Sequence, residues 1–149
     1  MIQVLKTDSS NTHFIALVAQ LDKELAIRDG EDHSFYAQFN SINTIKHVIV
    51  LYDDELPVAC GAIKHFDENS IEVKRMFVPI NFRQKGFAIL VLNEIEKWAK
   101  ELGYKSLILE TGLKQPEAIS LYKKYGFSII PNYGQYSGIE NSVCFKKEI

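Results

Sequence analysis

Two cations and a glycine stand at the start of the clearest helix that the sequence predicts, in an arrangement suited to binding an anion. Arg83, Lys85 and Gly86 follow a segment rich in β-branched and aromatic residues, 71–78, which predicts a strand that ends before Pro79. Free backbone N–H groups and the positive end of a helix dipole attract an anion, and a glycine lets the backbone approach it. Because two further positive charges are present, a pyrophosphate is the expected ligand.

The elements that must hold this loop follow from apolar spacing and turn residues. After a strand at 2–6 and candidate capping residues at 8–11, apolar side chains recur at helical spacing as far as Leu25. A shorter helix is expected over 34–40. Three strands joined by tight turns predict an antiparallel meander, at 46–52, 58–66 and 71–78.

The second half of the chain alternates helices and strands. The helix after Gly86 carries an apolar face from Ala88 to Leu102 and ends at Gly103. A buried strand at 106–110 is expected to run parallel to the strand at 71–78 through a right-handed crossover. The remaining elements are a helix from Pro116 to Tyr125 and strands at 127–131 and 142–147. The pattern predicts a mixed sheet flanked by helices, an α/β fold.

Length and composition are those of one globular domain spanning residues 1–149. The chain is 46% hydrophobic and 24% charged with a net charge of −2, so no basic excess indicates binding to nucleic acid or to an anionic membrane. No apolar run approaches the roughly 20 residues of a membrane span, and the N-terminus lacks a signal-peptide pattern. Cys60 and Cys144 stand far apart, which favours reduced thiols in a cytoplasmic protein, and the scattered histidines predict no metal site.

Two motifs in this order resemble a known family. Arg83-x-x-Gly86-x-Ala88, between a strand and a helix, resembles the coenzyme A signature of the GNAT superfamily of acetyl-CoA-dependent N-acetyltransferases. The segment 118–127 resembles the second signature of the family, Ala-x-x-Leu-Tyr-x-x-x-Gly-Phe. The predicted order β-α-α-β-β-β-α-β-α-β-β matches the GNAT fold from end to end. Gln84 and Gln115 depart from the Gly and the Asn that are common in the family.

The resemblance implies a sheet whose central parallel strands splay apart, so that the pantetheine arm of acetyl-CoA pairs with the backbone of the strand at 71–78. It also implies that the loop before Ala88 holds the pyrophosphate, with Arg83 adding charge. The implied coenzyme-binding residues are Met76, Phe77, Val78, Arg83, Gln84, Lys85, Gly86, Phe87, Ala88 and Gln115.

The implied chemistry is acetyl transfer to an amine by direct attack in a ternary complex, with the thioester carbonyl near the backbone N–H of about Phe77. Tyr122 occupies the family's position for the general acid that protonates the departing thiolate; its alternative is a core tyrosine. An alkylamine has a pKa of about 10 and must lose a proton before it attacks. Glu72 and Glu110 are both candidate bases, because a bulge reverses side-chain parity and the sequence does not locate it. The alternative for Glu72 is a solvent-facing strand residue paired with Lys74 or Arg75.

The acceptor is expected between the early helices and the last hairpin, and it is expected to be a primary amine. A small molecule or an amino acid is preferred over a protein amine, and the enzyme is expected to be a monomer or a homodimer. A non-catalytic acyl-CoA sensor on the same fold is the alternative. The candidate substrate-binding residues are Arg28, Asp29, Glu31, His33, Arg75, Tyr133 and Tyr136.

Overall fold

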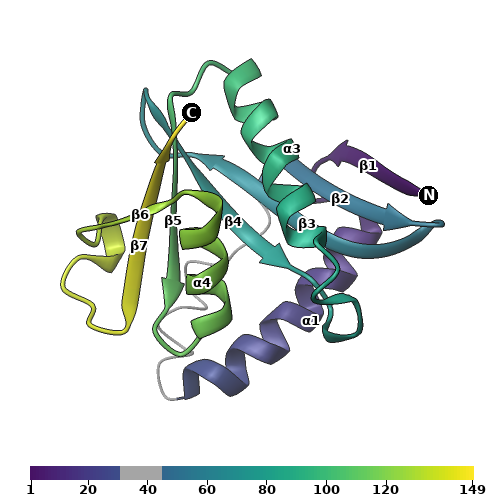
Figure 1. Ribbon diagram of the computed structural model, residues 1–149, viewed down its shortest axis with the longest axis horizontal. Coiled ribbons are helices and arrows are strands. Elements are labelled where there is room, and N and C mark those ends of the chain that lie inside the picture. The colour runs from purple at the N-terminus through teal and green to yellow at the C-terminus, as the bar shows by residue number, and fades with distance from the viewer. Residues whose placement is uncertain (31–44) are drawn as a thin grey trace.

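A twisted mixed sheet forms the middle of the molecule, and helices cover both of its faces (Figure 1). The computed structural model describes residues 1–30 and 45–149, except the side chain of Asp29. Seven strands of this part of the chain form the sheet, in the order β1-β2-β3-β4-β5-β7-β6. Their bounds are Ile2–Thr7 for β1, His47–Asp53 for β2, Leu56–His65 for β3, Ser70–Phe77 for β4, Ser106–Gly112 for β5, Ser128–Ile130 for β6 and Ser142–Glu148 for β7.

The strand directions confirm the predicted topology. β2, β3 and β4 pair antiparallel as a meander, and β4 pairs parallel with β5 through the helix between them. β7 then inserts antiparallel between β5 and β6. The sheet is therefore mixed, with its parallel pair in the centre.

Three α-helices of the described part flank this sheet: α1 (Thr12–Asp29), α3 (Phe87–Glu101) and α4 (Pro116–Tyr125). The side chain of Asn11 caps α1 by accepting a hydrogen bond of 2.9 Å from the backbone N–H of Phe14. Gly126, at a φ of 111°, ends α4 in the left-handed conformation that favours glycine. The helix predicted over 34–40 lies outside the described residues. No helix among the described residues is long and apolar enough to cross a membrane.

Two hydrophobic clusters fill the spaces on either side of the sheet. One lies under α3 and α4 and includes Val91, Ile95 and Leu107, and the other lies under α1. Gly61 permits the close approach of α3, because a Cβ built there would lie 2.6 Å from the sulfur of Met76 and 2.8 Å from Cγ1 of Val91. The expectation that Leu102 completes the buried face of α3 is wrong, since that side chain is 42% exposed beyond the helix end.

The central strands separate after a short paired stretch. β4 and β5 are paired only from Ser70 opposite Ser106 to Glu72 opposite Ile108. Beyond this point β4 bulges, since Cys60 faces Phe77 while Ala62 faces Lys74, which places one extra residue on β4. The two strands therefore diverge, as the family resemblance implied.

The bulge also reverses the faces of the strand. Arg75 sits in it with a φ of 58°. Val73 and Phe77 are an even number of residues apart, yet Val73 packs in the cluster under α3 and Phe77 in the cluster under α1. This reversal is the parity change that the sequence did not locate.

Candidate active site

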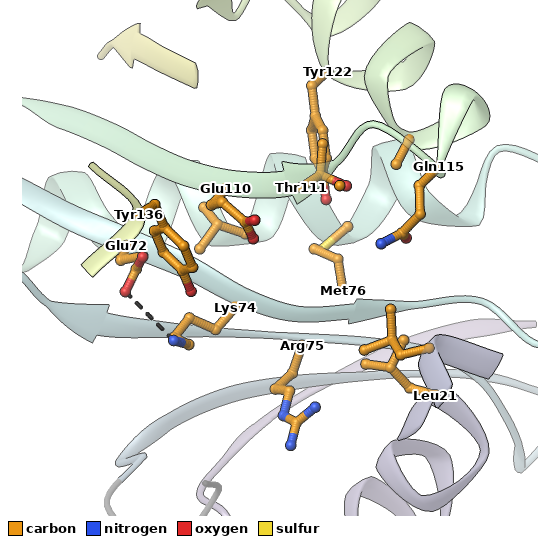
Figure 2. A pocket seen from close by; sticks show the side chains of 14 residues that line it. Leu21, Glu72, Lys74, Arg75, Met76, Glu110, Thr111, Gln115, Tyr122 and Tyr136 are labelled. Atoms are coloured by element: carbon orange, nitrogen blue, oxygen red, sulfur yellow. Dashed lines mark ion pairs between the residues drawn. The ribbon is translucent and has the colours of Figure 1, made fainter. Parts of the chain in front are cut away.

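A cleft opens where β4 and β5 separate, and side chains from five parts of the chain line it (Figure 2). β4 contributes 72–76, β5 contributes 110–112, α1 contributes Leu21 and Leu25, and Tyr136 closes one end. The segment at the start of α4 contributes Gln115, Ala118 and Tyr122. The cleft thus brings together all three residues predicted to be catalytic, Tyr122, Glu72 and Glu110.

Tyr122 reaches the cleft from α4, opposite Met76 of β4 (Figure 2). Its side chain is buried, and its ring packs edge-on against Phe127 with centroids 5.6 Å apart. Burial raises the pKa of the Tyr122 phenol, and the negative charge of Glu110 raises it further. The phenol therefore keeps its proton at neutral pH and is suited to donate it.

Glu72 lies at the point of divergence, because its pair with Ile108 is the last one between β4 and β5. The hydroxyl of Tyr133 donates a 2.6 Å hydrogen bond to Oε2 of Glu72. Nζ of Lys74 lies 3.7 Å from Oε1, and both of these side chains are about one-tenth exposed. The alternative of a solvent-facing Glu72 is wrong, because the side chain is buried, while its pairing with Lys74 is present inside the cleft.

Lys74 is a cleft residue that sequence reasoning missed. Burial lowers the pKa of its ammonium, and the negative charge of Glu72 partly opposes that effect. The available signal was the period of two along a strand, which places residues 72 and 74 on one face. The end of the cleft near Tyr136 therefore holds both signs of charge.

Glu110 approaches the cleft from β5, and Figure 2 shows it between Tyr136 and Tyr122. It pairs across the sheet with Cys144 of β7, whose thiol pKa burial raises to about 11. The negative charge of Glu110 contributes to the raised pKa of Tyr122 and of Tyr136. Both candidate bases thus border the same space from opposite strands.

The predicted phosphate loop lies between β4 and α3. A short 3-10 helix at Ile80–Phe82, absent from the prediction, leads to Gln84 and Gly86, whose φ values are 63° and 83°. Among the described residues no side chain caps the N-terminus of α3, which starts at Phe87. The first backbone N–H groups of a helix have no partner within the helix, so the loop offers donors to an anion.

Arg83 is engaged within the protein at this loop. Its guanidinium donates hydrogen bonds of 2.9 and 2.8 Å to the two oxygens of Glu24 on α1, and its Nε donates one of 2.8 Å to the carbonyl of Val78. The guanidinium also lies 5.8 Å from the ring centroid of Phe77. Nζ of Lys85 lies over the ring of Phe82, 5.9 Å from its centroid. The structure thus places the Arg83 charge between the loop and α1.

The candidate acceptor residues divide into four groups. Arg75 and Tyr136 line the cleft, and Arg75 pairs with Asp22 of α1 at 2.8 Å. Arg28 lies at the end of α1, where it pairs with Glu24 at 3.6 Å and with Glu117 of α4. Tyr133 does not line the cleft but is hydrogen-bonded to Glu72. Glu31, His33 and the side chain of Asp29 lie outside the described residues.

Residues 8–127 match the family model described as Acetyltransferase (GNAT) family, so the chain belongs to that family. It is 36% identical over 98 residues to the uncharacterized N-acetyltransferase YsnE of Bacillus subtilis, an alignment that covers 64% of each chain. It is 38% identical over 93 residues to an IAA acetyltransferase of Azospirillum brasilense, covering 62% of this chain and 61% of that one. The chain therefore spans less than two thirds of the length of either relative.

A solved structure shares the fold over nearly the whole chain. A GNAT family acetyltransferase from Elizabethkingia anophelis, with acetyl-CoA bound, superposes with a TM-score of 0.72 at 19% identity. The superposition covers 99% of this chain and 98% of that one. At this identity the likeness shows the fold alone.

Proposed function

We propose that this protein transfers an acetyl group from acetyl-CoA to a primary amine. The observation that carries the proposal is the cleft between β4 and β5, in which a protonated phenol, Tyr122, shares one space with the carboxylates of Glu72 and Glu110. Membership of the GNAT family and the acetyl-CoA bound to the Elizabethkingia protein support the same co-substrate.

The residues of the loop and the cleft fit this co-substrate. The uncapped N-terminus of α3, opened by Gly86, suits the pyrophosphate, with the backbone from Gln84 to Ala88 as its donors. Met76, Phe77 and Val78 lie at and beyond the bulge, where β4 no longer pairs with β5. Their backbone groups are therefore the candidates for hydrogen bonds to the pantetheine arm, and the N–H of Phe77 for one to the carbonyl oxygen. Acetyl-CoA supplies the activated acyl group and a thiolate leaving group.

The side chains would then handle the two protons of the reaction. Glu72 or Glu110 accepts a proton from the acceptor ammonium, directly or through a water, so that a neutral amine attacks. Tyr122 donates its proton to the departing thiolate. The buried thiols of Cys60 and Cys144, whose pKa values burial raises to about 12 and about 11, are unsuited to a covalent intermediate, which favours direct attack.

The charges in the cleft favour a small acceptor of mixed charge. Glu72 and Glu110 suit an ammonium group, while Lys74 and Arg75 suit a carboxylate on the same molecule. An amino acid or a related small amine fits this pattern. Arg75 already pairs with Asp22, so it would bind a substrate carboxylate as a shared partner.

The test is release of coenzyme A thiol from acetyl-CoA with a panel of amino acids, diamines and aralkylamines, with the acetylated product identified by mass spectrometry. We expect turnover with at least one member of the panel and its loss in Tyr122→Phe. Tight acetyl-CoA binding with no acetylated product from any amine would instead support the non-catalytic sensor.

A further inference from the structure

Tyr133 contacts Glu72 without lining the cleft itself. Of the late loop between β6 and β7, Tyr136 lines the cleft, whereas Tyr133 reaches Glu72 through the 2.6 Å hydrogen bond to Oε2. The two residues are 61 positions apart, so this contact joins the loop to the point where the central strands diverge.

Two ring contacts hold the Tyr133 hydroxyl in place. Its ring packs edge-on against Phe66, with centroids 5.1 Å apart, and against Tyr136, with centroids 5.9 Å apart. Edge-to-face pairs of this kind restrict how a ring tilts. A short 3-10 helix, Gly134–Tyr136, follows directly and keeps the two tyrosines adjacent.

The hydrogen bond has one direction. Burial and the neighbouring Glu72 charge raise the pKa of the Tyr133 phenol far above its ordinary value, so the phenol stays protonated. Tyr133 is therefore always the donor, and Glu72 always the acceptor through Oε2. Oε1 remains on the side of Lys74, which lines the cleft.

Other titratable groups surround Glu72. They are Lys74 on its own strand, Lys64 opposite it on β3, Glu110 on β5, Cys144 on β7, and Tyr136 on the loop. In addition to these groups, Tyr133 donates the 2.6 Å hydrogen bond to Oε2 of Glu72.

We infer that Tyr133 is a positioning residue that holds Glu72 by Oε2, so that Oε1 accepts the proton of the acceptor ammonium. This inference rests on the proposed function and assigns the base role to Glu72. In that step an N–H bond breaks, an O–H bond forms at Oε1, and the electron pair stays on nitrogen to attack the acyl carbon.

The variant Tyr133→Phe removes one oxygen and keeps the ring contacts. The carbon-13 NMR resonance of the Glu72 carboxylate, assigned by its loss in Glu72→Gln, reports the contact without any substrate. We expect this resonance to move in Tyr133→Phe, because the carboxylate loses a hydrogen-bond donor. An unchanged resonance overturns the inference. The matched control is Tyr104→Phe, which loses a phenol bonded to His65 at 2.7 Å outside the cleft and should leave the resonance unchanged.

Kinetics with the best acceptor of the amine panel test the functional part of the inference, which is that Tyr133 acts through Glu72. In Tyr133→Phe we expect kcat to fall about tenfold and the KM for acetyl-CoA to stay constant. In a Glu72→Gln background the same substitution should have no effect, because Tyr133 acts through Glu72. Equal losses in both backgrounds would show that Tyr133 acts by another route.

A second measurement covers the case in which Tyr133→Phe does not fold. The hydroxyl proton of Tyr133 in the unmodified protein should give a downfield resonance that shifts upfield in Glu72→Gln. Absence of this shift contradicts the contact. Failure of every amine to react would reject the proposed function while the NMR result stands by itself, so the two failures are distinguishable.

Discussion

The guanidinium of Arg83 donates hydrogen bonds to both carboxylate oxygens of Glu24, at 2.9 and 2.8 Å. Through Nε the same side chain also holds the carbonyl of Val78, at the end of β4. One arginine therefore ties the predicted phosphate loop to α1 and to the strand before it. Since both side chains of the pair are 29% exposed, we expect a modest contribution from it, about 1 kcal/mol.

Glu24→Gln separates two possible roles for Arg83, which are to anchor the loop and to bind the pyrophosphate. If Arg83 holds the loop, the variant should bind acetyl-CoA about two- to fivefold more weakly in isothermal titration calorimetry, because the loop loses its anchor. Tighter binding would instead show that Glu24 competes with the pyrophosphate for the guanidinium. Lys23→Gln, on the exposed side of the same helix, is the control and should bind normally.

Gly86 tests the anion site directly. Its φ of 83° favours glycine, while a Cβ there would meet no atom within 4 Å, so a substitution acts through backbone strain and charge. We expect Gly86→Asp to raise the KM for acetyl-CoA at least tenfold more than Gly86→Asn does, because asparagine has the same shape without the charge. Equal KM values for the two variants would show that no phosphate rests there.

Tyr122→Phe should lower kcat by about a hundredfold and leave the KM for acetyl-CoA nearly unchanged, as expected for loss of a general acid. Burial raises the Tyr122 pKa, so the protonated form persists as the pH rises through about 10, the ordinary value of a phenol. The rate of the unmodified enzyme should accordingly show no basic limb from this residue below pH 10. A hundredfold rise in KM at constant kcat would identify Tyr122 as a binding residue.

The two candidate bases can be separated by their amide variants. Glu72→Gln should reduce turnover mainly at low pH, where the acceptor amine is protonated and needs a base. Glu110→Gln should keep the shape of the pH profile of turnover. Its maximum turnover should change less than that of Glu72→Gln. A pH profile of Glu72→Gln that matches the unmodified enzyme would assign the base role to Glu110 or to water.

Gly61→Val tests the packing of α3 on the sheet. The new side chain would overlap Met76, Val91 and Ile95, so we expect a loss of about 1–3 kcal/mol in the free energy of unfolding from overpacking. Chemical denaturation measures this loss. The free energy of unfolding of Gly61→Ala should lie between that of the unmodified protein and that of Gly61→Val. Unchanged stability in Gly61→Val would mean that α3 sits farther from β3 than the structure shows.

The sequence predicts the elements well because their signals are local. Turn residues and apolar periods gave the meander, the parallel crossover and the helices from Phe87 and Pro116. The resemblance of two motifs then led to the family, which the match over residues 8–127 confirms. The 3-10 helices at Ile80–Phe82 and Gly134–Tyr136 were missed, since such short turns carry little sequence signal.

The site depends on contacts between distant residues, and these the sequence does not show. Tyr133 bonds to Glu72 across 61 positions, and Arg83 to Glu24 across 59. The bulge at Arg75 decides which face each β4 side chain takes, and no turn residue marks it. Lys74 was missed, because strand periodicity places it on one face with Glu72 but only burial shows that its charge lies inside the cleft.

The most direct test of this account is a crystal structure of the protein with coenzyme A. We predict the pyrophosphate against the backbone N–H groups of residues 84–88, and the pantetheine arm between β4 and β5 with its sulfur near Tyr122. Coenzyme bound elsewhere, or an arm that leaves the space between the two strands empty, would contradict the account.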